Sequence, residues 1–467
     1  METKQMKSRL STYVFLVVLF TGQAVNCASL PKVSEVIDEA PNARTQRQIV
    51  SSRGLLSPQQ SKALIDRMKR SVDPTDILGR HTAVVESVTD SPLTKGNRVT
   101  LLADGQAAYA AMFTAIKAAR QQINLESYII EDDATGRKFA DLLLKKQAKG
   151  VQVNIIYDSV GCMNTPAAFF QRLRDGGIQV VEFNPVNPLN ALKDWELKQR
   201  DHRKMLIADS KTAIIGGINI SKVYSSSPLK RKRKANSPIH WRDTDILIEG
   251  PAVAELEKLF HDTWLKQKGP KLSLANYPQG RKEKGNALVR VVGSTPGETN
   301  RIPFIVYVSA ISFADHSIHL TNSYFIPDEQ ILKALVDAAR RGVDVKIILP
   351  GITDSKLALY AQRHYYAELL QAGVKIYEHK SSLLHAKTAV IDKVWSTVGS
   401  TNLDFLSLLS NDEVNAIILS REFAVEMEKM FVSDLAGSSQ IQREQWENRP
   451  LLHRVREWFV NLISRFL

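Results

Sequence analysis

The sequence has little cysteine and no long apolar run. Two Cys among 467 residues are too few for a disulfide-stabilised scaffold. The apolar run of residues 13–20 is too short to span a bilayer, which needs about 20 apolar residues, and no other stretch is long and apolar enough. Apolar residues nevertheless make up 44% of the chain, which excludes a disordered protein. At about 100–200 residues per domain, the length predicts two or three domains.

The N-terminus has the pattern of an export signal. Basic residues precede the apolar run, and small and polar residues follow it, as in secretory signals. We expect residues 1–28 to form this signal, with cleavage after Ala24 and export to the cell envelope. A lipid anchor at Cys27 and an uncleaved apolar anchor remain alternatives. Since cleavage removes or lipidates Cys27, Cys162 stays as the only thiol, and no structural disulfide is expected.

The C-terminus predicts an amphipathic helix over residues 451–467. Pro450 suits its first turn, and apolar residues recur at helical spacing. The helix either packs its apolar stripe on the domain core or lies in a membrane surface with its aromatic face in lipid. The stripe consists of Leu451, Leu452, Val455, Trp458, Phe459, Leu462, Ile463, Phe466 and Leu467.

Positive charge is concentrated in two short segments. The chain has 62 Lys+Arg and 49 Asp+Glu, a formal net charge of +13, which predicts an anionic partner such as nucleic acid or a membrane surface. Residues 222–240 carry a net +6 and residues 265–284 a net +5. This local distribution favours anionic lipid headgroups over nucleic acid. The run of residues 230–234 is either a plain solvated loop or a contact for such headgroups.

The chain also contains an internal duplication. A Gly-Val-x-Val-x-Ile-Ile string begins at Gly150 and again at Gly342, and a Ser-Tyr pair precedes each, ending at Tyr128 and Tyr324. Short β-branched runs alternate with amphipathic stretches, so each copy predicts strand, helix, strand, helix, strand. The predicted fold is therefore α/β, with two duplicated domains that each have a mixed sheet flanked by helices.

The domain boundaries follow from this duplication. The segment between the copies is rich in Lys, Pro and Gly, which is typical of a linker. We expect one chain to act as a monomer with an internal pseudo-dimer. The predicted parts are an export signal (1–28), an N-terminal leader of unknown role (29–85), a first repeat (86–264), a basic linker (265–285), a second repeat (286–440) and an amphipathic C-terminal helix (441–467).

Each repeat carries the polar pattern H-x-K-x4-D, followed by G-[GS]-x-N. Chance gives one H-x-K-x4-D in about one such sequence in thirty, so two copies in register with the duplicated strands are not accidental. In a strand, the His and Lys point to the same face, and the residues before the Asp continue into the core. Two such motifs, related by an internal twofold, can face each other across one pocket. The residues are His202, Lys204, Asp209 and Asn219, then His385, Lys387, Asp392, Ser400 and Asn402.

These motifs resemble the paired HKD motifs of the phospholipase D superfamily, and the resemblance covers about residues 85–467. The surrounding strings are similar to the bacterial cardiolipin synthase branch, notably around Asp243 and Glu413. The chain departs from that branch at Asp245, where the branch usually has His, in the basic insert, and in having no N-terminal transmembrane hairpin. The resemblance implies two phospholipase D-like domains related by a pseudo-twofold, with one shared active site.

The resemblance also implies metal-independent cleavage of a phosphodiester through a phosphohistidine, without a cofactor. One His attacks phosphorus, and the other acts first as general acid and then as general base. By family precedent His202 is the nucleophile and His385 the acid. The sequence alone does not decide between the two histidines, because the two halves are nearly symmetric. Lys204 and Lys387 supply fixed positive charge to the phosphate.

Further residues complete the implied site. In the family, a carboxylate that follows each motif orients the His of that motif. This carboxylate is Asp243 in the first repeat and Glu413 in the second. Asp209 and Asp392 are either catalytic or structural. No metal-binding group is expected. The residues implied in phosphate binding are Asn219, Asn402 and Ser400.

Two classes of enzyme follow from these features, whereas the two complete motifs argue against a third class, a catalytically silent binding protein. The first is a phosphatidyltransferase like cardiolipin synthase, acting on phospholipids at an anionic membrane surface. A close alternative is a phospholipase D that passes the phosphatidyl group to water and releases phosphatidic acid. An exported nuclease of the same superfamily is less favoured, because the export signal and the amphipathic tail point to lipid, and no nucleic acid is expected as a partner.

Overall fold

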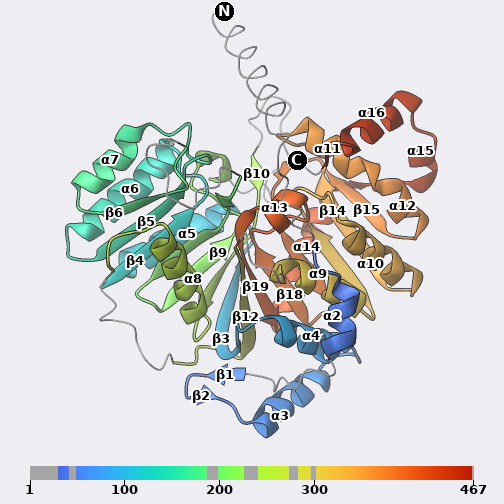
Figure 1. The fold of residues 1–467 in the computed structure, drawn as a ribbon, viewed down its shortest axis with the longest axis horizontal. Coiled ribbons are helices and arrows are strands. Elements are labelled where there is room, and N and C mark those ends of the chain that lie inside the picture. Colours follow the sequence, from blue (N-terminus) through green and yellow to red (C-terminus); the bar gives the residue numbers. More distant parts are fainter. Residues whose placement is uncertain are drawn as a thin grey trace, which may run out of the picture. The chain divides into compact units, whose positions relative to one another are not determined.

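Figure 1 shows the computed structural model of the chain, which describes residues 30–40, 49–186, 198–225, 240–272, 282–295 and 301–464. Three predicted features lie outside these residues: the export signal with Cys27, the basic run of residues 230–234, and the middle of the basic linker. Lys32–Leu467 form one compact unit by their internal contacts. Within the described residues, no helix combines the length and the apolar character that crossing a membrane requires.

The first repeat is built on three parallel strands joined by helices, as the duplication predicts. In chain order the elements are β4 (Gln122–Ser127), α6 (Ala134–Gln147), β5 (Gln152–Asp158), α7 (Ala167–Asp175) and β6 (Gln179–Phe183). β5 pairs in parallel with both β4 and β6. Asp133 caps α6 by accepting hydrogen bonds from the amides of Thr135 and Gly136, which explains where this helix begins.

Antiparallel strands complete the sheet of the first repeat. They are β3 (Leu93–Leu102), β8 (Lys204–Ala208), β9 (Thr212–Gly216) and β11 (Asp245–Glu249). The order across the sheet is β6-β5-β4-β8-β9-β11-β3. Residues of α5 (Gly105–Ala118), α6 and α7 share one core cluster with this sheet, whereas α8 (Val253–Lys266) belongs to a second cluster. Helices therefore cover both faces of a mixed sheet.

The second repeat has the same strand order. Its strands are β12 (Ala287–Ser294), β13 (Ser317–Thr321), β14 (Asp344–Pro350), β15 (Lys375–His379), β17 (Thr388–Ile391), β18 (Trp395–Gly399) and β19 (Asn411–Leu419). They pair in the order β15-β14-β13-β17-β18-β19-β12, with β13, β14 and β15 parallel. Its helices are α9 (Ile302–Ser312), α10 (Glu329–Arg340), α11 (Lys356–His364), α12 (Tyr366–Gln371), α13 (Phe405–Leu409) and α14 (Arg421–Ala436). The predicted duplication and α/β fold are confirmed.

The two repeats join through β3 and β12. These strands pair antiparallel, with Thr94 opposite Val289. In Figure 1, the teal and green first repeat lies on the left and the orange and red second repeat on the right, with β3, β12 and β19 between them. One apolar cluster takes residues from both repeats, among them Ile215 and Val398. This shared core fixes the two motifs relative to each other.

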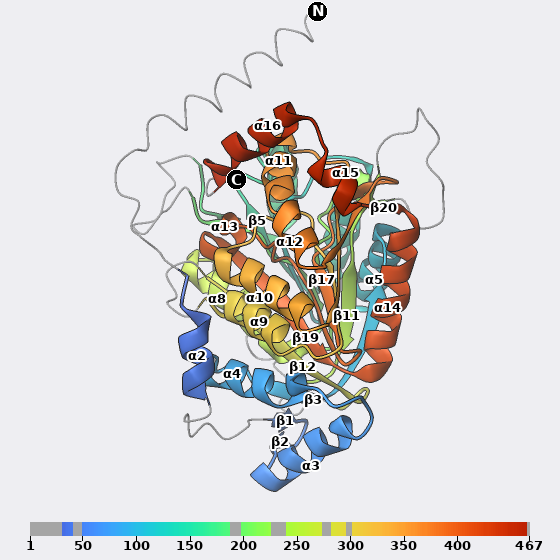
Figure 2. The same ribbon diagram turned by 90° about the vertical axis from the view of Figure 1, so that its right-hand side faces the viewer.

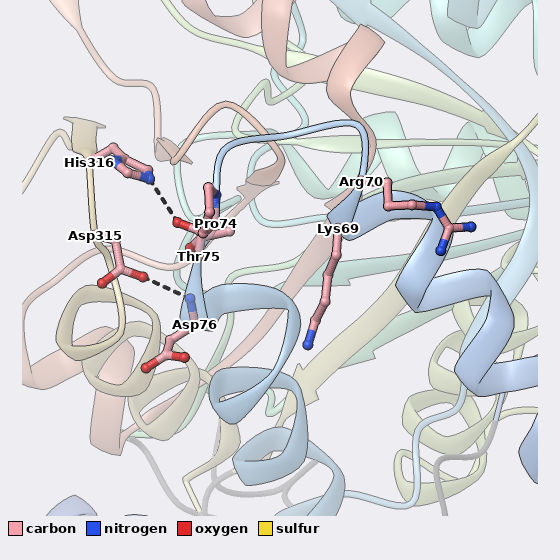
Figure 3. A pocket seen from close by; sticks show the side chains of 7 residues that line it. All are labelled: Lys69, Arg70, Pro74, Thr75, Asp76, Asp315 and His316. Carbon is pink, nitrogen blue, oxygen red and sulfur yellow. Dashed lines mark hydrogen bonds between the residues drawn. The ribbon is translucent and has the colours of Figure 1, made fainter.

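The N-terminal leader packs against this joined sheet. Its elements are α2 (Val33–Glu39), β1 (Ile49–Ser51), β2 (Gly54–Leu55), α3 (Pro58–Lys69) and α4 (Arg80–Val88). β1 pairs with β3, and the Thr75 hydroxyl donates a hydrogen bond to Asp392 (2.5 Å). Beside this contact the Asp76 amide donates to Asp315 (2.7 Å), next to a cavity of about 730 Å³ (Figure 3). The leader therefore contacts the second motif directly.

The C-terminal segment ends in the predicted helix. β20 (Ser438–Gln440) pairs with β15, and α15 (Arg443–Glu447) and α16 (Leu451–Asn461) follow. Within α16 only Glu457 and Val460 are buried, while the apolar stripe is exposed as far as Ile463. The interpretation that this stripe packs on the domain core is wrong, because the helix contacts the protein through its opposite face.

Candidate active site

Two short strand pairs cross between the repeats beside the motif histidines. β7 (Arg200–Asp201) pairs in parallel with the start of β19, and β10 (Trp241–Arg242) pairs in parallel with β16 (Leu383–Leu384). One further hydrogen bond extends each pair. The His202 amide donates to the Asp412 carbonyl (2.9 Å), and the His385 amide donates to the Arg242 carbonyl (2.7 Å). The residue after each of these carbonyls is an acid, so each His lies beside an acid of the opposite repeat.

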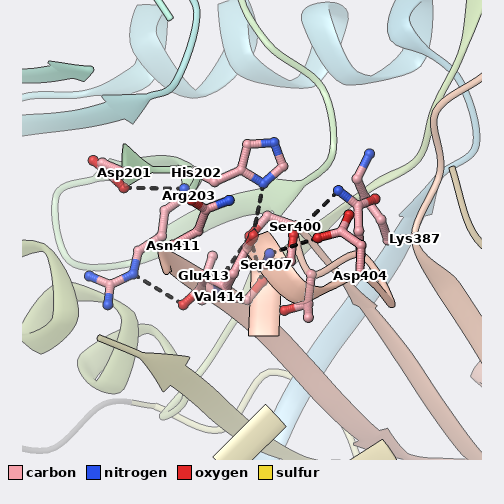
Figure 4. Close-up of polar contacts among 12 residues, drawn as sticks. Asp201, His202, Arg203, Lys387, Ser400, Asp404, Ser407, Asn411, Glu413 and Val414 are labelled. Atoms are coloured by element: carbon pink, nitrogen blue, oxygen red, sulfur yellow. Dashed lines mark hydrogen bonds and ion pairs between the residues drawn. The ribbon is translucent and has the colours of Figure 1, made fainter. Parts of the chain in front are cut away.

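His202 and His385 each bind that acid through Nδ1. His202 Nδ1 lies 3.0 Å from Glu413 Oε1, as Figure 4 shows, and His385 Nδ1 lies 2.7 Å from Asp243 Oδ2. All four side chains are buried. The two acids are those that the sequence singles out. The expectation that each acid orients the His of its own repeat is wrong, because the crossing strands place each acid against the opposite motif.

The other nitrogen of each imidazole stays available. Among the residues that the structure describes, Nε2 of neither His202 nor His385 has a hydrogen-bond partner. Because the proton of a neutral ring sits on the Nδ1 that faces a carboxylate, the lone pair is on Nε2. Such an atom can attack an electrophile or, once protonated, donate a proton.

Lys204 and Lys387 reach back toward the histidines. Each ammonium donates to the carbonyl of the His two residues before it. Lys204 Nζ lies 5.2 Å from the centre of the Tyr128 ring, and Lys387 Nζ lies 3.0 Å from His385 Nδ1. Burial lowers the pKa of Lys204 to about 7 and the pKa of Lys387 to about 8. A bound phosphodiester anion raises both pKa values and so favours the charged lysines. That Lys204 and Lys387 supply positive charge to the phosphate stays a prediction.

Charges of one repeat act on the histidine of the other. Burial lowers the pKa of His202, and the charges of Lys204 and Lys387 add to this, while Glu413 opposes it. Burial, Lys387 and Lys204 lower the pKa of His385 to about 4 against the opposing charge of its acid. Because each His senses the Lys of the opposite repeat, the two motifs form a single electrostatic site.

Comparison with known proteins identifies the family of the chain. The family described as "Cardiolipin synthase, PLD-like domain" matches residues 112–264 and 307–435, which contain both motifs. The chain belongs to this cardiolipin synthase family. The expected resemblance is confirmed.

Individual relatives cover most of the chain. A cardiolipin synthase of Alkalihalophilus pseudofirmus is 33% identical over 81% of this chain and 74% of its own length. Cardiolipin synthase A of Pseudomonas aeruginosa is 34% identical over 81% of this chain and 75% of its own length. The crystal structure of phosphatidylserine synthase from Haemophilus influenzae has the same fold, with a TM-score of 0.62 at 13% identity over 82% of this chain and 98% of that one.

In this member of the cardiolipin synthase family, the two acids are supported differently. The Ser400 hydroxyl donates a short hydrogen bond to Glu413 and accepts one from the Val414 amide (3.0 Å). The matching residue of the first repeat is Gly217, where a Cβ would lie 2.2 Å from Asp243 Oδ1. The hydroxyl expected to bind the substrate phosphate is thus engaged by an acid, and the glycine leaves room for the other acid.

Asn219 and Asn402, expected to bind phosphate, hold side chains around the site. Asn219 Nδ2 donates to the Tyr224 hydroxyl (3.2 Å), which itself lies 3.5 Å from His385 Nδ1. Asn402 Oδ1 accepts a hydrogen bond from the Ser323 hydroxyl (2.6 Å). Both side chains are buried. Direct phosphate binding by these amides stays a prediction.

Asp209 and Asp392 lie at the opposite ends of their strands from the histidines. Asp209 accepts hydrogen bonds from the amides of residues 120–122, and Asp392 from the amides of residues 315–317. Their φ angles of 52° and 49° place both in left-handed turns. A carboxylate that binds three amides fixes a strand end and is not free for chemistry. The geometry supports the structural alternative for these two residues, and a catalytic role for them stays an untested prediction.

Aromatic rings that the sequence analysis did not single out as site residues surround the histidines. Tyr128 contacts His202, with 5.1 Å between ring centres. Three rings surround His385: Trp241 at 4.9 Å, Tyr224 at 6.1 Å and Tyr324 at 6.2 Å between centres. Tyr128 and Tyr324 end the duplicated Ser-Tyr strings, so the duplication itself was a signal for these two. Nothing local in the sequence indicated Tyr224.

Asp245, where the bacterial branch usually has His, is buried at the site's edge. It stands opposite Gly216 in the sheet, as Asn415 stands opposite Gly399 in the second repeat. Burial and the charge of Asp243 raise its pKa well above the ordinary value. Asp245 therefore holds the position that the amide side chain of Asn415 holds in the second repeat.

Proposed function

We propose that this protein is a phosphatidyltransferase of the cardiolipin synthase type. It cleaves the phosphodiester of one phospholipid through a phosphohistidine and passes the phosphatidyl group to the hydroxyl of a second phospholipid. The observation that carries this proposal is the pair of buried histidines from the two repeats, each bound through Nδ1 to an acid of the opposite repeat. Relatives named cardiolipin synthase over most of the chain support the choice of reaction.

In the first step, His202 Nε2 attacks phosphorus of a phosphatidylglycerol. A phosphorus–nitrogen bond forms, the phosphorus–oxygen bond to the leaving glycerol breaks, and its electron pair stays on that oxygen. Protonated His385 gives its Nε2 proton to the oxygen, so free glycerol leaves and phosphatidyl-His202 remains. Glu413 holds the imidazole of His202 in orientation and stabilises the positive charge that develops on it.

In the second step, neutral His385 takes the proton from the hydroxyl of a second phosphatidylglycerol. That oxygen attacks phosphorus, the phosphorus–nitrogen bond breaks, and the electron pair returns to His202 Nε2. The product is cardiolipin, and both histidines return to their starting protonation states. The assignment of His202 as nucleophile follows the family precedent, because both imidazoles have a free Nε2.

The lysines couple substrate binding to protonation. In the free site, burial keeps the pKa values of Lys204 and Lys387 near neutrality. A phosphodiester anion favours the protonated forms of both lysines and of the acid histidine. The arriving substrate therefore assembles the positive charge that stabilises the extra negative charge of the pentacoordinate transition state.

The protein's surroundings form part of the same proposal. An anionic membrane surface supplies both lipids, and export to the cell envelope places the protein beside such a surface. A single chain holds a complete site, since both histidines and both acids come from its two repeats. Water in place of the second lipid turns the same chemistry into a phospholipase D reaction.

The product spectrum on phosphatidylglycerol vesicles tests this function. We expect cardiolipin and glycerol in equal amounts, measured by mass spectrometry and an enzymatic glycerol assay. Addition of EDTA leaves the rate unchanged. Phosphatidic acid with glycerol identifies the hydrolase instead. Cleavage of plasmid DNA with no change in lipid identifies a nuclease and rejects the proposal.

A further inference from the structure

The C-terminal helix α16 presents its apolar face to solvent. At about 100° per residue, its large apolar side chains gather on one face, and they are exposed, with Trp458 at 57% and Phe459 at 62%. The side chains that it buries, Glu457 at 3% and Val460 at 7%, lie on the opposite face. An amphipathic helix docked on a core has the reverse arrangement. The exposed stripe of α16 and the turn after it consists of Leu451, Leu452, Val455, Trp458, Phe459, Leu462 and Ile463.

Polar contacts hold the helix in this orientation. The Glu457 carboxylate accepts a hydrogen bond from the Arg449 guanidinium (2.6 Å), and Asn461 Oδ1 accepts one from the Tyr365 hydroxyl (3.1 Å). A buried carboxylate with an arginine partner is costly to expose or to separate from that partner. The outward stripe is therefore the consequence of a specific docking mode, since rotating the helix inward would break both contacts.

The helix is anchored beside the second half of the active site. Val460 shares an apolar cluster with Ile326, which lies two residues after Tyr324, whose ring centre is 6.2 Å from that of His385. The Tyr324 hydroxyl donates to Asp354 (2.7 Å), directly before the N-cap of α11. Figures 1 and 2 both show α16 lying against α11. Packing of Val460 on Ile326 thus connects α16 to the strand end that carries Tyr324, a neighbour of His385.

We propose that the exposed stripe of α16 inserts into the surface of an anionic phospholipid bilayer and holds the active site against its lipid substrate. This inference rests on the proposed function, which makes a bilayer lipid the substrate. Arg454 and Arg456 are exposed and, by helical spacing, flank the stripe on its two sides. They contact anionic headgroups while the apolar side chains enter the boundary between headgroups and acyl chains.

Charge favours a membrane over a second copy of the chain. A twofold dimer would place the same stripe face to face, which brings the arginines of both copies together. An anionic bilayer instead offers opposite charge along both flanks. One exposed apolar residue, Leu357, belongs to α11, the helix against which α16 lies.

Flotation of the full chain with vesicles tests the proposal. The probes are vesicles of phosphatidylcholine containing phosphatidylglycerol, and vesicles of phosphatidylcholine alone. We expect the double variant Trp458→Ser/Phe459→Ser to lower the partition constant at least about tenfold, because two aromatic side chains no longer enter the interface. Arg454→Gln and Arg456→Gln should each lower it about fivefold, on the anionic vesicles only.

A matched control and a solvent test complete the design. Val425→Ser/Val432→Ser removes two exposed apolar side chains of α14 and should bind vesicles as the unmodified chain does. Equal binding by the stripe variant and the unmodified chain would overturn the proposal. Iodide quenching of Trp458, measured without vesicles against Trp458→Phe, should be efficient. Protection of Trp458 from iodide shows that a second copy or another segment of the chain covers the stripe, and it overturns the proposal too.

Turnover distinguishes failure of this inference from failure of the proposed function. The substrates are short-chain phosphatidylglycerol dissolved as monomers and long-chain phosphatidylglycerol in vesicles. In the stripe variant we expect the ratio of vesicle to monomer turnover to fall about tenfold. An unchanged ratio would reject the membrane role of α16 and would leave the proposed function intact. An unmodified chain that turns over neither substrate rejects the proposed function, whatever the flotation result.

Discussion

The two histidines hold equivalent positions in the two repeats, yet their surroundings differ. His202 binds Glu413, which a serine hydroxyl also supports, and the ring of Tyr128 lies against it. His385 binds the shorter Asp243, has Lys387 3.0 Å from the same nitrogen, and lies among three aromatic rings. Duplication thus supplied two His–Lys pairs, and later divergence of their neighbours made them chemically distinct.

This difference suggests a division of labour. An aromatic enclosure excludes water and lowers the local dielectric constant, which strengthens every charge interaction inside it. Around His385, the proposed acid and base, such an enclosure favours a lipid hydroxyl over water as acceptor. Around His202, the hydroxyl-supported glutamate favours a fixed orientation of the attacking nitrogen. The predictions below test whether the two sides differ in this way.

The largest effect should come from the histidines themselves. His202→Ala and His385→Ala should each lower kcat on phosphatidylglycerol by about 10⁴-fold or more, because each removes a reacting group. A phosphodiester with a p-nitrophenol leaving group needs no acid in the first step. On this substrate, His385→Ala should release p-nitrophenol in a burst, whereas His202→Ala should not. A burst from His202→Ala instead would reverse the assignment, and wild-type activity of either variant would reject the paired mechanism.

The crossed acids should have the next largest effect. Glu413→Gln and Asp243→Asn keep the shape of the side chain but no longer stabilise an imidazolium, so we expect kcat to fall about 10³-fold. The burst assay separates them: Glu413→Gln should slow the burst, and Asp243→Asn should spare it and slow steady turnover. Pairing of each acid with the His of its own repeat would produce the opposite result.

These crossed contacts show where prediction from the sequence stops. Strand and helix order and both motifs could be predicted, because each depends on local periodicity or on spacing within one repeat. The identity of the two acids followed from the resemblance to the family. The partner of each acid depends on β7, β10 and β16, which are two residues long and carry no periodic signal. They join residues 211 and 142 positions apart, and only the packing of whole repeats decides such contacts.

The C-terminal helix illustrates the same limit. Its spacing predicted an apolar stripe and a helix starting at Leu451, and both are present. Periodicity does not tell which face packs on the protein. That choice depends on partners far along the chain, such as Tyr365 for Asn461 and Ile326 for Val460. The N-terminal leader shows the same limit of prediction, since nothing in the local sequence indicates that Thr75 binds Asp392.

Titration of the lysines should affect both sides of the site. Deprotonation above pKa values of about 7 for Lys204 and about 8 for Lys387 removes positive charge, so kcat/KM should fall as pH rises. Above pH about 8 we expect a fall of clearly more than tenfold per unit, which is steeper than the tenfold fall that loss of one proton explains, because two groups lose charge. Circular dichroism at each pH confirms that the chain stays folded. A flat profile up to pH 9 contradicts the role of the lysines.

The residues that support the two acids offer a matched pair of substitutions. Ser400→Ala removes one hydrogen bond to a buried charge, which should lower kcat about tenfold. Gly217→Ala adds a Cβ only 2.2 Å from Asp243 Oδ1, so this acid must move away from His385, and we expect a fall of about a hundredfold. Measurement of kcat for both variants checks which substitution has the larger effect, and crystal structures check whether the acid has moved. A larger loss in Ser400→Ala would show that the His202 side is the more sensitive one.

The smallest effect on kcat should come from substitution of Asp209, which belongs to the first repeat but lies away from both histidines. Asp209→Asn tolerates the left-handed turn at φ 52°, yet it loses a carboxylate that accepts hydrogen bonds from three consecutive backbone amides. We expect the free energy of unfolding to fall by about 2 kcal/mol, with kcat per folded molecule nearly unchanged. Urea unfolding and active-site titration measure the two quantities. A loss of kcat without a loss of stability would instead show that Asp209 takes part in the reaction. The functional difference between the Asp at the end of each strand and the His at its start would then no longer hold.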